Sequence, residues 1–343
     1  MEIKGINRSN LDAWFEAHIE EAEPPLTFSL ITGGHSNLTF RVEDSQGRLF
    51  VLRRPPTGAV IATAHDMARE HRIISALAPT AVPVPRALGL CEDENVNDAP
   101  FYVMDFVDGY VLTDSIITAK KFDRTQRGEI GEDVIRVLSD LHKVVPKDVG
   151  LGDLGREEAY IPRQLKRWKT QWEKTKTREL PVMDEVYEGL QSGVPEQQAA
   201  CIVHGDYRLG NMLTGSDARV AAVLDWELCT LGDPLADLGY IMNNWNHEDE
   251  LVPVGGGATG FPTSAGGFPE REEFVARYEQ NTGFDASRIE YYRAFQYWRL
   301  AAIVEGVLSR YIKGVMGEKG DTSAFQAQVD GLAEAAHQRM AEI

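Results

Sequence analysis

The spacing of apolar residues changes twice along the chain. Near the N-terminus, Leu11, Trp14 and Phe15 recur at the helical period. The period then shortens, and runs rich in Thr, Val, Phe, Ile and Leu alternate with turn residues. These runs occupy residues 27–32, 37–43, 48–54, 86–91 and 101–107. The pattern predicts an antiparallel sheet, with one helix at about 65–78 that ends before Pro79.

Beyond Gly109 the helical period returns and dominates. Short apolar runs at 200–204 and 220–224 predict buried strands within this helical part. Residues 251–269 contain six Gly and three Pro without apolar periodicity, so we expect a long loop, either a lid over a substrate or a disordered segment. A strand-rich part of about 110 residues thus precedes a larger helical part, with the boundary expected within 105–112.

Charge and composition narrow the classes of function. The chain has 343 residues, enough for two domains or two lobes. It carries 35 Lys and Arg against 53 Asp and Glu, a formal net charge of −18. A protein that binds nucleic acid usually carries a basic surface that neutralises phosphates, so we expect no nucleic-acid partner. No run approaches 18 consecutive apolar residues, and no membrane association is expected.

The cysteines and the N-terminal residues indicate in which cellular compartment the protein is expected. Three cysteines lie far apart and form no CxxC pair, which argues against a disulfide framework or a zinc site. The first ten residues, MEIKGINRSN, contain no apolar segment of the kind found in signal peptides. We therefore expect a cytoplasmic protein, while its oligomeric state stays open.

The clearest chemical motif is the segment HGDYRLGN at residues 204–211, directly after the apolar run Cys201-Ile202-Val203. An Asp (206), an Asn five residues later (211) and a second Asp after another strand (225) reproduce the spacing of a kinase catalytic loop. Asp206 can accept the proton of an attacking hydroxyl, and Asn211 and Asp225 offer hard oxygen ligands to Mg²⁺. A polar turn beside a buried histidine is the structural alternative for this segment.

The segments IVHGDYRLGNML, VLDWE and GDPLADLG resemble those of the aminoglycoside phosphotransferase and choline kinase superfamily. The sequence is most similar to the branch related to the kinase-like N-terminal domain of acyl-CoA dehydrogenase fusion proteins. The resemblance covers about residues 25–315. It implies an α+β, two-lobed, protein-kinase-like fold. Residues 1–107 would form a nucleotide-binding lobe with an antiparallel sheet and a helix, and residues 108–343 a larger, mostly helical lobe that binds the substrate and carries the catalytic residues.

The resemblance also implies positions for the nucleotide. Backbone groups of the turn at 33–37 would cover the ATP phosphates, although a Gly-Gly hairpin turn is the simpler interpretation and no GxGxxG is present. Arg53, where most kinases have Lys, would bind phosphate, and Glu70 would pair with it. Residues of the hinge after the last strand would hold adenine. The positions concerned are Gly33, Gly34, Ser36, Asn37, Arg53, Glu70, Met104, Asp105 and Val107.

Further along, Asp233 is a candidate cap for the next helix, with Pro234 at its first position, and Asp237 would brace the catalytic loop by analogy with the family. Residues 163–178 form the one basic concentration of the chain, which either receives an anionic acceptor or is a solvated helix face. An aromatic cluster at 291–298 either captures an amine or forms a buried face.

Together these features predict an ATP- and Mg²⁺-dependent phosphotransferase that acts on the hydroxyl of a small molecule. The resemblance suggests a hydroxyacyl-CoA-like acceptor. An aminoglycoside or amino-alcohol kinase is the alternative within the class, and a carboxylate-rich lining of the site would favour it. A nucleotide-binding regulator without catalysis is the alternative from another class, since Arg53 and the loose Gly turn depart from the usual kinase pattern.

Overall fold

The computed structural model describes residues 3–31, 37–57, 66–250, 259–314 and 322–343. The chain divides into two compact units. Unit 1 comprises Met1–Tyr110 and the short segment Ala221–Leu228, and unit 2 comprises Val111–Val220 and Cys229–Ile343. The division into lobes of residues 1–107 and 108–343, which the resemblance implies, stays a prediction.

Unit 1 is built on a five-stranded antiparallel sheet with the strand order β1-β2-β3-β5-β4. Its strands are β1 (Thr27–Leu30), β2 (Leu38–Glu43), β3 (Leu49–Arg54), β4 (Ala87–Cys91) and β5 (Phe101–Asp105). Its helices are α1 (Arg8–His18), α2 (Met67–Leu77) and the short α3 (Glu94–Asn97). The expected strands are thus present, as is the helix expected at about 65–78, and the short helix α3 was not expected.

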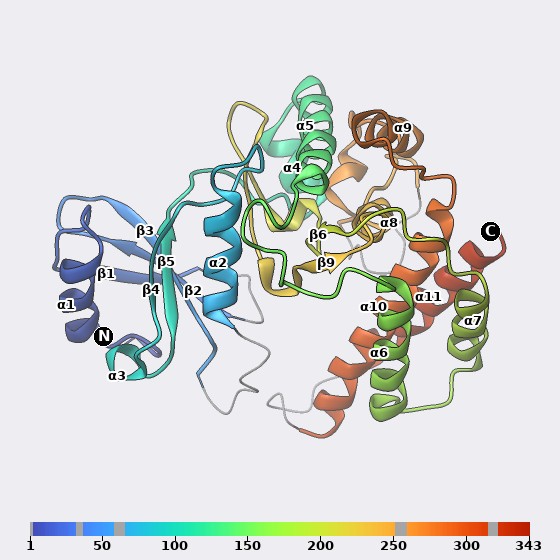
Figure 1. Cartoon of the computed structure of the whole chain (residues 1–343), viewed down its shortest axis with the longest axis horizontal. Helices are drawn as coiled ribbons and strands as arrows, with labels where there is room; N and C mark the ends of the chain where they lie inside the picture. Colours follow the sequence, from blue (N-terminus) through green and yellow to red (C-terminus); the bar gives the residue numbers. More distant parts are fainter. Residues whose placement is uncertain (1–2, 32–36, 58–65, 251–258, 315–321) are drawn as a thin grey trace. The chain divides into compact units, whose positions relative to one another are not determined.

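The two faces of the sheet are covered by different helices, as Figure 1 shows for α1 and α2. Because successive side chains of a strand point to opposite faces, Phe50 and Leu52 of β3 enter the core against α1. Arg53 lies on the other face, where it pairs with Glu70 of α2. Alternation along one strand therefore places Arg53 on the face away from the core that packs against α1.

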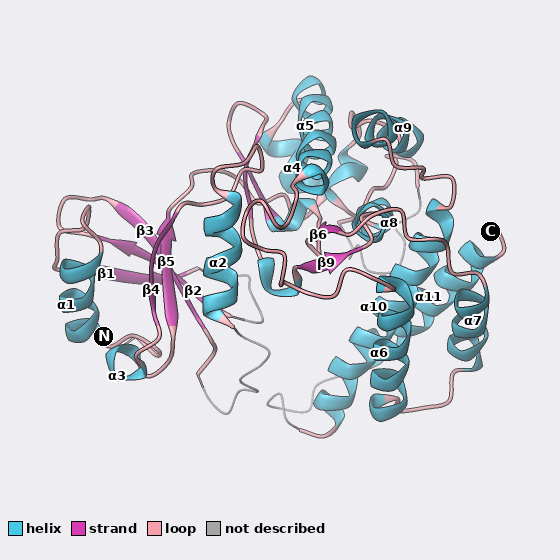
Figure 2. Ribbon diagram, in the orientation of Figure 1, coloured by secondary structure: helices cyan, strands magenta, loops and turns pink. Residues whose placement is uncertain are grey.

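Unit 2 is mostly helical (Figure 2). Its helices are α4 (Ser115–Lys121), α5 (Arg124–Lys143), α6 (Tyr160–Thr175), α7 (Pro181–Ser192), α8 (Leu235–Asn243), α9 (Arg271–Thr282), α10 (Ile289–Ile312) and α11 (Ser323–Met340), with short 3₁₀ turns at Leu209–Asn211 and Pro262–Ala265. Helix α10 is central, because it packs against α6, α7, α8 and α11. The aromatic cluster 291–298 lies on α10 and is buried, which confirms the buried-face interpretation.

Short strands support the loops of unit 2. β6 (Cys201–Val203) pairs antiparallel with β9 (Thr230–Gly232). β7 (Met212–Thr214) and β8 (Val220–Val223) follow each other through a tight turn, closed by the bond from the Gly215 N–H to the Arg219 carbonyl at 2.8 Å. The expected strands at 200–204 and 220–224 are confirmed, and β7 and β9 were not expected. In the part of the chain that is described, no helix has the length and apolar character to span a bilayer.

Candidate active site

The segment after β6 forms a tightly bonded loop. Val203 ends the strand, and Gly205 follows with φ of +85°, a conformation that glycine adopts without steric cost. His204 is fully buried, and its Nδ1 accepts the backbone N–H of Asp206 at 3.2 Å. A 3₁₀ turn at Leu209–Asn211 then returns the chain toward Asp206. The loop therefore presents one carboxylate from a rigid backbone.

The structure brings Asp206 and Asn211 together, as their spacing predicts. The Asn211 amide nitrogen donates to the Asp206 carboxylate at 2.6 Å and to the Asp206 carbonyl at 2.9 Å. Arg208 Nε approaches the other carboxylate oxygen at 3.3 Å, and the Tyr240 hydroxyl also hydrogen-bonds to Asp206. Burial and the charge of Asp206 raise the pKa of Tyr240 far above its ordinary value, so this phenol stays a donor. Asp206 is thus held by three side chains.

Asp237 of α8 fixes the backbone of the same loop. Its carboxylate is fully buried and accepts the N–H of His204 at 2.7 Å and that of Gly205 at 2.8 Å. Burial acts to raise the pKa of Asp237, but His142, at 3.4 Å, and the bonded backbone N–H groups lower it overall. The carboxylate therefore stays ionised, and it braces the loop as the sequence suggested.

Asp233 has a local structural role. Its Oδ1 accepts the N–H of Leu235, the first residue of α8, at 3.1 Å, and its other oxygen accepts the Tyr292 hydroxyl at 2.7 Å. Pro234 is the N-cap of α8 and not its first helical residue, so the expected cap is displaced by one position.

Unit 1 contains a second charged group, the Arg53 cluster, made of Arg53, Glu70, Tyr102 and Asp225. Arg53 Nε lies 2.9 Å from Glu70, and its Nη2 lies 2.5 Å from Asp225. The Tyr102 hydroxyl donates to Glu70 at 3.1 Å. The two arginines that end β3 are distinguished by this geometry, since Arg54 bonds instead to the carbonyls of Gly5 and Asn97 on the other face.

The cluster holds more negative than positive charge. Burial raises the pKa of Glu70 to about 7, the charge of Arg53 lowers it, and the carboxylates of Asp225 and Glu227 raise it further. Burial acts to lower the pKa of Arg53, but Tyr102 and the two carboxylates that it contacts raise it overall, so the guanidinium remains charged. Arg53 thus pairs with more than one carboxylate, and a second cation would stabilise the cluster by neutralising the remaining negative charge.

Asp225 occupies an unusual backbone conformation. Its φ is +66°, a value that residues with a side chain rarely adopt. The preceding strand is tied to unit 1 by the bond from the Val223 N–H to the Pro83 carbonyl at 2.8 Å, and the following Trp226 is buried. A strained backbone between two anchored residues is typical of functional positions, where the surroundings impose the conformation.

The predicted hinge lies at the end of β5. Met104 is buried within the strand and pairs with Val51 of β3. The N–H of Asp105 already donates to the Arg86 carbonyl at 3.0 Å, and its side chain pairs with the Arg86 guanidinium. Any contact of Asp105 with adenine would therefore use its carbonyl oxygen. Val107 lies beyond the strand and makes no hydrogen bond to any residue that the structure describes.

Of the turn expected to cover the phosphates, only Asn37 can be placed. Gly33, Gly34 and Ser36 lie outside the described residues. The Asn37 amide is buried and donates to Glu70 at 3.1 Å and to Glu227 at 3.5 Å. Asn37 thus contacts Glu70 of the Arg53 cluster and the nearby Glu227.

A cavity of about 320 Å³ in unit 2 reaches Asp206. Its walls come from α8, α10, α11 and the segments around residues 112 and 261, and they combine aromatic, aliphatic and amide side chains. The lining residues include Leu112, Arg208, Tyr240, Asn243, Asn244, Trp245, Phe261, Gln296, Tyr297 and Gln328. Asp206 is the only carboxylate among the lining residues in the described part of the chain.

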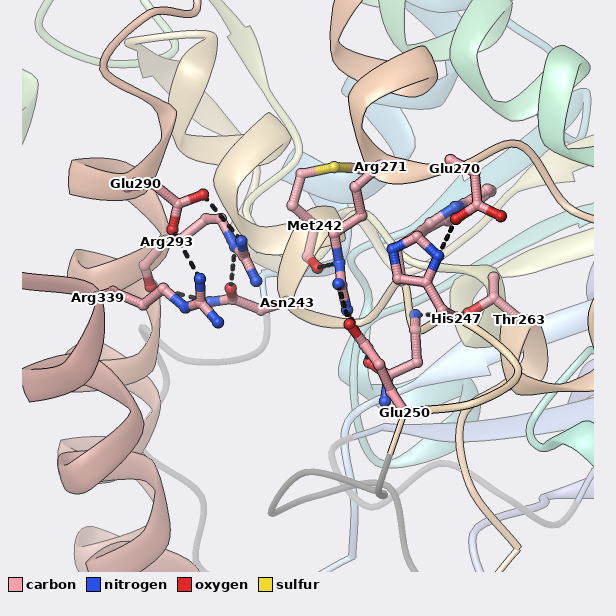
Figure 3. A network of polar contacts seen from close by, with 12 residues as sticks. Met242, Asn243, His247, Glu250, Thr263, Glu270, Arg271, Glu290, Arg293 and Arg339 are labelled. Atoms are coloured by element: carbon pink, nitrogen blue, oxygen red, sulfur yellow. Dashed lines mark hydrogen bonds and ion pairs between the residues drawn. The ribbon is translucent and has the colours of Figure 1, made fainter. Parts of the chain in front are cut away.

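Several polar groups of this lining are already satisfied. Asn243 exchanges two hydrogen bonds with Arg293, which in turn pairs with Glu290 (Figure 3). In the same network Arg271 holds Glu250 and the Met242 carbonyl, so the chain on either side of the Asn243–Trp245 wall is anchored (Figure 3). The described lining of the cavity is therefore largely uncharged, and its charged side chains are those of Arg208 and Asp206.

Three contributors to these sites were not found from the sequence. Tyr102 faces Arg53 directly across β3 and β5, and only the strand register shows this. Tyr240 lies three residues after Asp237 on α8, and nothing in its sequence context marks it as a partner of Asp206. Arg299 of α10 donates to the Gly205 carbonyl at 3.0 Å, although 94 residues separate the two along the chain.

The basic segment 163–178 is paired with acids of its own helix α6 and of other helices. Lys169 pairs with Glu173 and Asp184, and Lys176 pairs with Glu173. Arg178 pairs with two further acids, from α10 and α11. Lys166, Arg167 and Lys174 are the exposed remainder. Much of the positive charge of 163–178 is thus neutralised within unit 2.

A braced loop carrying Asp206 and Asn211, and a sheet-bound arginine paired to a helical glutamate, are typical of kinase-like phosphotransferases. A comparison with protein families agrees, because residues 27–292 match the model of the phosphotransferase enzyme family. The chain belongs to this family.

Individual relatives support the same conclusion. Acyl-CoA dehydrogenase family member 10 of Mus musculus is 35% identical over 292 residues, which cover 84% of this chain and 27% of that protein. The chain spans only 27% to 42% of the length of the curated relatives first compared. The expected resemblance to acyl-CoA dehydrogenase fusion proteins is confirmed.

Solved structures confirm the α+β, protein-kinase-like fold. A crystal structure from Ralstonia eutropha JMP134, provisionally named an aminoglycoside phosphotransferase, is 33% identical, with a TM-score of 0.82 over 97% of this chain and 98% of its own. The aminoglycoside phosphotransferase APH(4)-Ia, solved with AMP-PNP and hygromycin B, is 16% identical, with a TM-score of 0.60 over 96% of this chain and 97% of its own.

Proposed function

We propose that this protein transfers the γ-phosphoryl group of MgATP to a hydroxyl group of a small molecule. The observation that carries the proposal is the position of Asp206, which a hydrogen-bonded loop presents to a cavity of about 320 Å³. Phosphoryl transfer depends on positioning and on charge neutralisation more than on covalent chemistry. A braced carboxylate beside a cavity of small-molecule size supplies the first of these requirements.

In the proposed reaction each residue has one task. A carboxylate oxygen of Asp206 accepts the proton of the acceptor hydroxyl as its oxygen attacks the γ-phosphorus. Asn211 and Tyr240 orient this carboxylate through the bonds described above. Arg53, kept in place by Glu70, would neutralise phosphate charge on the nucleotide.

The residues present fit a magnesium ion that takes most of its ligands from the nucleotide. Among the described residues, no group of three or more His, Cys, Asp or Glu could hold a metal by itself. Mg²⁺ commonly keeps several waters and uses one or two protein oxygens together with substrate phosphates. Asp225, within a cluster that has excess negative charge, and the amide oxygen of Asn211 would be those ligands. When bound, the ion would neutralise the charge of the transferring phosphoryl group.

The nucleotide would be ATP, because the structural neighbour with AMP-PNP shares the fold. The adenine would lie against Met104 at the end of β5, with hydrogen bonds to the carbonyl of Asp105 and the N–H of Val107. Gly33, Gly34, Ser36 and Asn37 would approach the phosphates. These assignments extend the family pattern to residues of this chain and are part of the proposal.

The lining of the cavity bears on the acceptor. Aminoglycosides carry several ammonium groups, which need carboxylates when they are desolvated. Among the described residues that line the cavity, Asp206 has no acidic companion, and Arg208 is a cation. This favours a neutral or anionic acceptor over an amino sugar. Because the relatives include acyl-CoA dehydrogenase family members, we propose a hydroxyacyl-CoA-like compound as the first acceptor to test.

The exposed part of the basic helix supplies a second, more specific test of this acceptor. We propose that Lys166, Arg167 and Lys174 contact acceptor phosphates. Reversing these three charges should raise the KM for the acceptor and leave the KM for ATP unchanged. An unchanged acceptor KM would remove the helix from acceptor binding.

The decisive experiment measures ADP release from MgATP with a panel of hydroxyacyl-CoAs, aminoglycosides, amino alcohols and sugars. Asp206→Ala should abolish transfer and keep nucleotide binding, whereas Asp217→Ala, an exposed aspartate of the turn after β7, should behave as wild type. Wild-type turnover in Asp206→Ala would refute the assigned role. Tight MgATP binding without transfer to any acceptor would favour a nucleotide-binding regulator.

A further inference from the structure

Helix α10 carries a buried arginine, Arg299, that has no acidic partner among the residues that the structure describes. Arg299 is 6% exposed, and no described carboxylate lies within 4.0 Å of its guanidinium. Its charge is instead placed against the ring of Trp168 on α6, 5.6 Å from the ring centroid. Burial of an unpaired cation is costly, and a cation–π contact recovers only a part of this cost. An uncharged side chain would suit the packing of α10 better, which indicates that Arg299 has a task besides folding.

The donors of Arg299 show what this task is. Its Nη2 donates to the carbonyl of Gly205 at 3.0 Å. The same peptide group ends in the N–H of Asp206, which donates to His204 Nδ1 at 3.2 Å. Both polar atoms of the peptide that precedes Asp206 are therefore held by side chains. A fixed peptide plane sets the direction in which the Asp206 side chain leaves the backbone.

The second donor of Arg299 reaches the cavity. Its Nη1 donates to the amide oxygen of Gln296 at 2.8 Å, and the Gln296 nitrogen donates to the Ala236 carbonyl at 2.7 Å. Gln296 lines the cavity that also contains Asp206. One guanidinium thus ties the loop that carries the base to the wall that would contact the acceptor.

We propose that Arg299 is a positioning residue that fixes the direction of the Asp206 carboxylate relative to the acceptor cavity. The proposal rests on the function proposed above. The planar guanidinium fork holds its two donors at fixed, separate positions, whereas a lysine ammonium is a compact charge with rotating donors, so we expect lysine to keep the two contacts less well. Loss of the fork should leave the cavity and the base present but misaligned, and a misplacement of about 1 Å can reduce a rate about 10²-fold.

The test compares Arg299→Met, Arg299→Lys and the matched control Arg310→Met, which changes an exposed arginine of the same helix. Two quantities are measured on the full chain. The first is kcat and KM for MgATP in ADP release, with the best acceptor of the panel above. The second is hydrogen exchange, by mass spectrometry, of the peptide that spans the loop 204–211.

For Arg299→Met we expect kcat to fall about 10²-fold with the KM for MgATP unchanged, together with faster exchange of the loop peptide. Arg299→Lys should retain intermediate kcat, and Arg310→Met should match wild type in both measurements. Unchanged kcat and unchanged loop exchange in Arg299→Met would overturn the proposal. Full activity of Arg299→Lys would also overturn it, because charge alone would then suffice.

The exchange measurement separates this proposal from the proposed function. If wild type transfers phosphate to no acceptor, the phosphotransferase proposal fails, yet the loop peptide still reports whether Arg299 holds it. If Arg299→Met does not fold, Arg299→Lys and Arg310→Met carry the comparison of kcat and exchange.

Discussion

Replacement of Asp237 tests how much the backbone of the catalytic loop depends on one buried carboxylate. Asp237→Ala leaves the N–H groups of His204 and Gly205 without an acceptor in a site closed to water. Each lost bond to a charged acceptor corresponds to about 1.5–3 kcal/mol. We therefore expect a loss of about 4 kcal/mol in the free energy of unfolding. For domains of about 150–250 residues, this lowers Tm by about 8–16 °C.

The same carboxylate predicts a pH dependence. The pKa of Asp237 is lower in the folded state than its ordinary value of 3.8. Its contribution to stability is then fully present above the unfolded pKa and is lost as the pH falls through the folded pKa. Asp237→Asn, which keeps the size of the side chain, should flatten the acid limb of the stability curve. It should also be less destabilising than Asp237→Ala, because one oxygen still accepts one N–H.

Urea unfolding followed by circular dichroism, at neutral pH and in acid, measures both effects. Asp148→Ala, at an exposed position of unit 2, is the matched control and should stay within about 0.5 kcal/mol of wild type. If Asp237→Ala unfolds within about 1 kcal/mol of wild type, the two backbone bonds do not brace the loop, and the reasoning fails.

Two further predictions concern the Arg53 cluster. The folded pKa of Glu70, about 7, exceeds its ordinary value of 4.5, so its contribution to stability is present below the ordinary value and is lost as the pH rises through about 7. The two values correspond to about 3 kcal/mol, and Glu70→Gln should remove this slope in urea unfolding between about pH 5 and pH 8; an unaltered slope would exclude Glu70 as its source. Asp225→Asn should weaken MgATP binding about tenfold in calorimetry, equivalent to about 1.4 kcal/mol, but should not weaken binding of metal-free ATP. Equal losses for both ligands would remove Asp225 from the metal site.

Much of unit 1 could be predicted because alternation along a strand is a strong local signal. The run at 48–54 predicts a strand, and the alternation of side chains along a strand places Arg53 and Arg54 on opposite faces. The sequence could not show that the face of Arg53 is the one covered by α2. β7 and β9 were missed because three residues are too few to establish a period.

Some contacts of the candidate site could likewise be predicted from local sequence, and others could not. The pairing of Asp206 with Asn211 follows from a spacing of five residues and could be predicted. The contacts of Tyr240 and Arg299 depend on how α8 and α10 pack against the loop, and no local pattern encodes them. Composition left open whether 163–178 binds an anion or is a solvated helix face, and the acids that pair with Lys169 and Arg178 include residues of α7, α10 and α11. Charge content alone cannot reveal such distant partners.

The segment Ala221–Leu228 has a consequence for synthesis on the ribosome. Residues up to Tyr110 leave the ribosome first, but unit 1 also includes this later segment, which supplies Asp225 to Arg53. At about 5–20 residues per second, synthesis from residue 111 through Leu228 takes roughly 6–24 s. During that interval the guanidinium of Arg53 and the carboxylate of Glu70 lack one of their final neighbours. Unit 1 is therefore completed only after most of residues 111–228 have been synthesised, and a fragment that stops near residue 110 would lack Asp225.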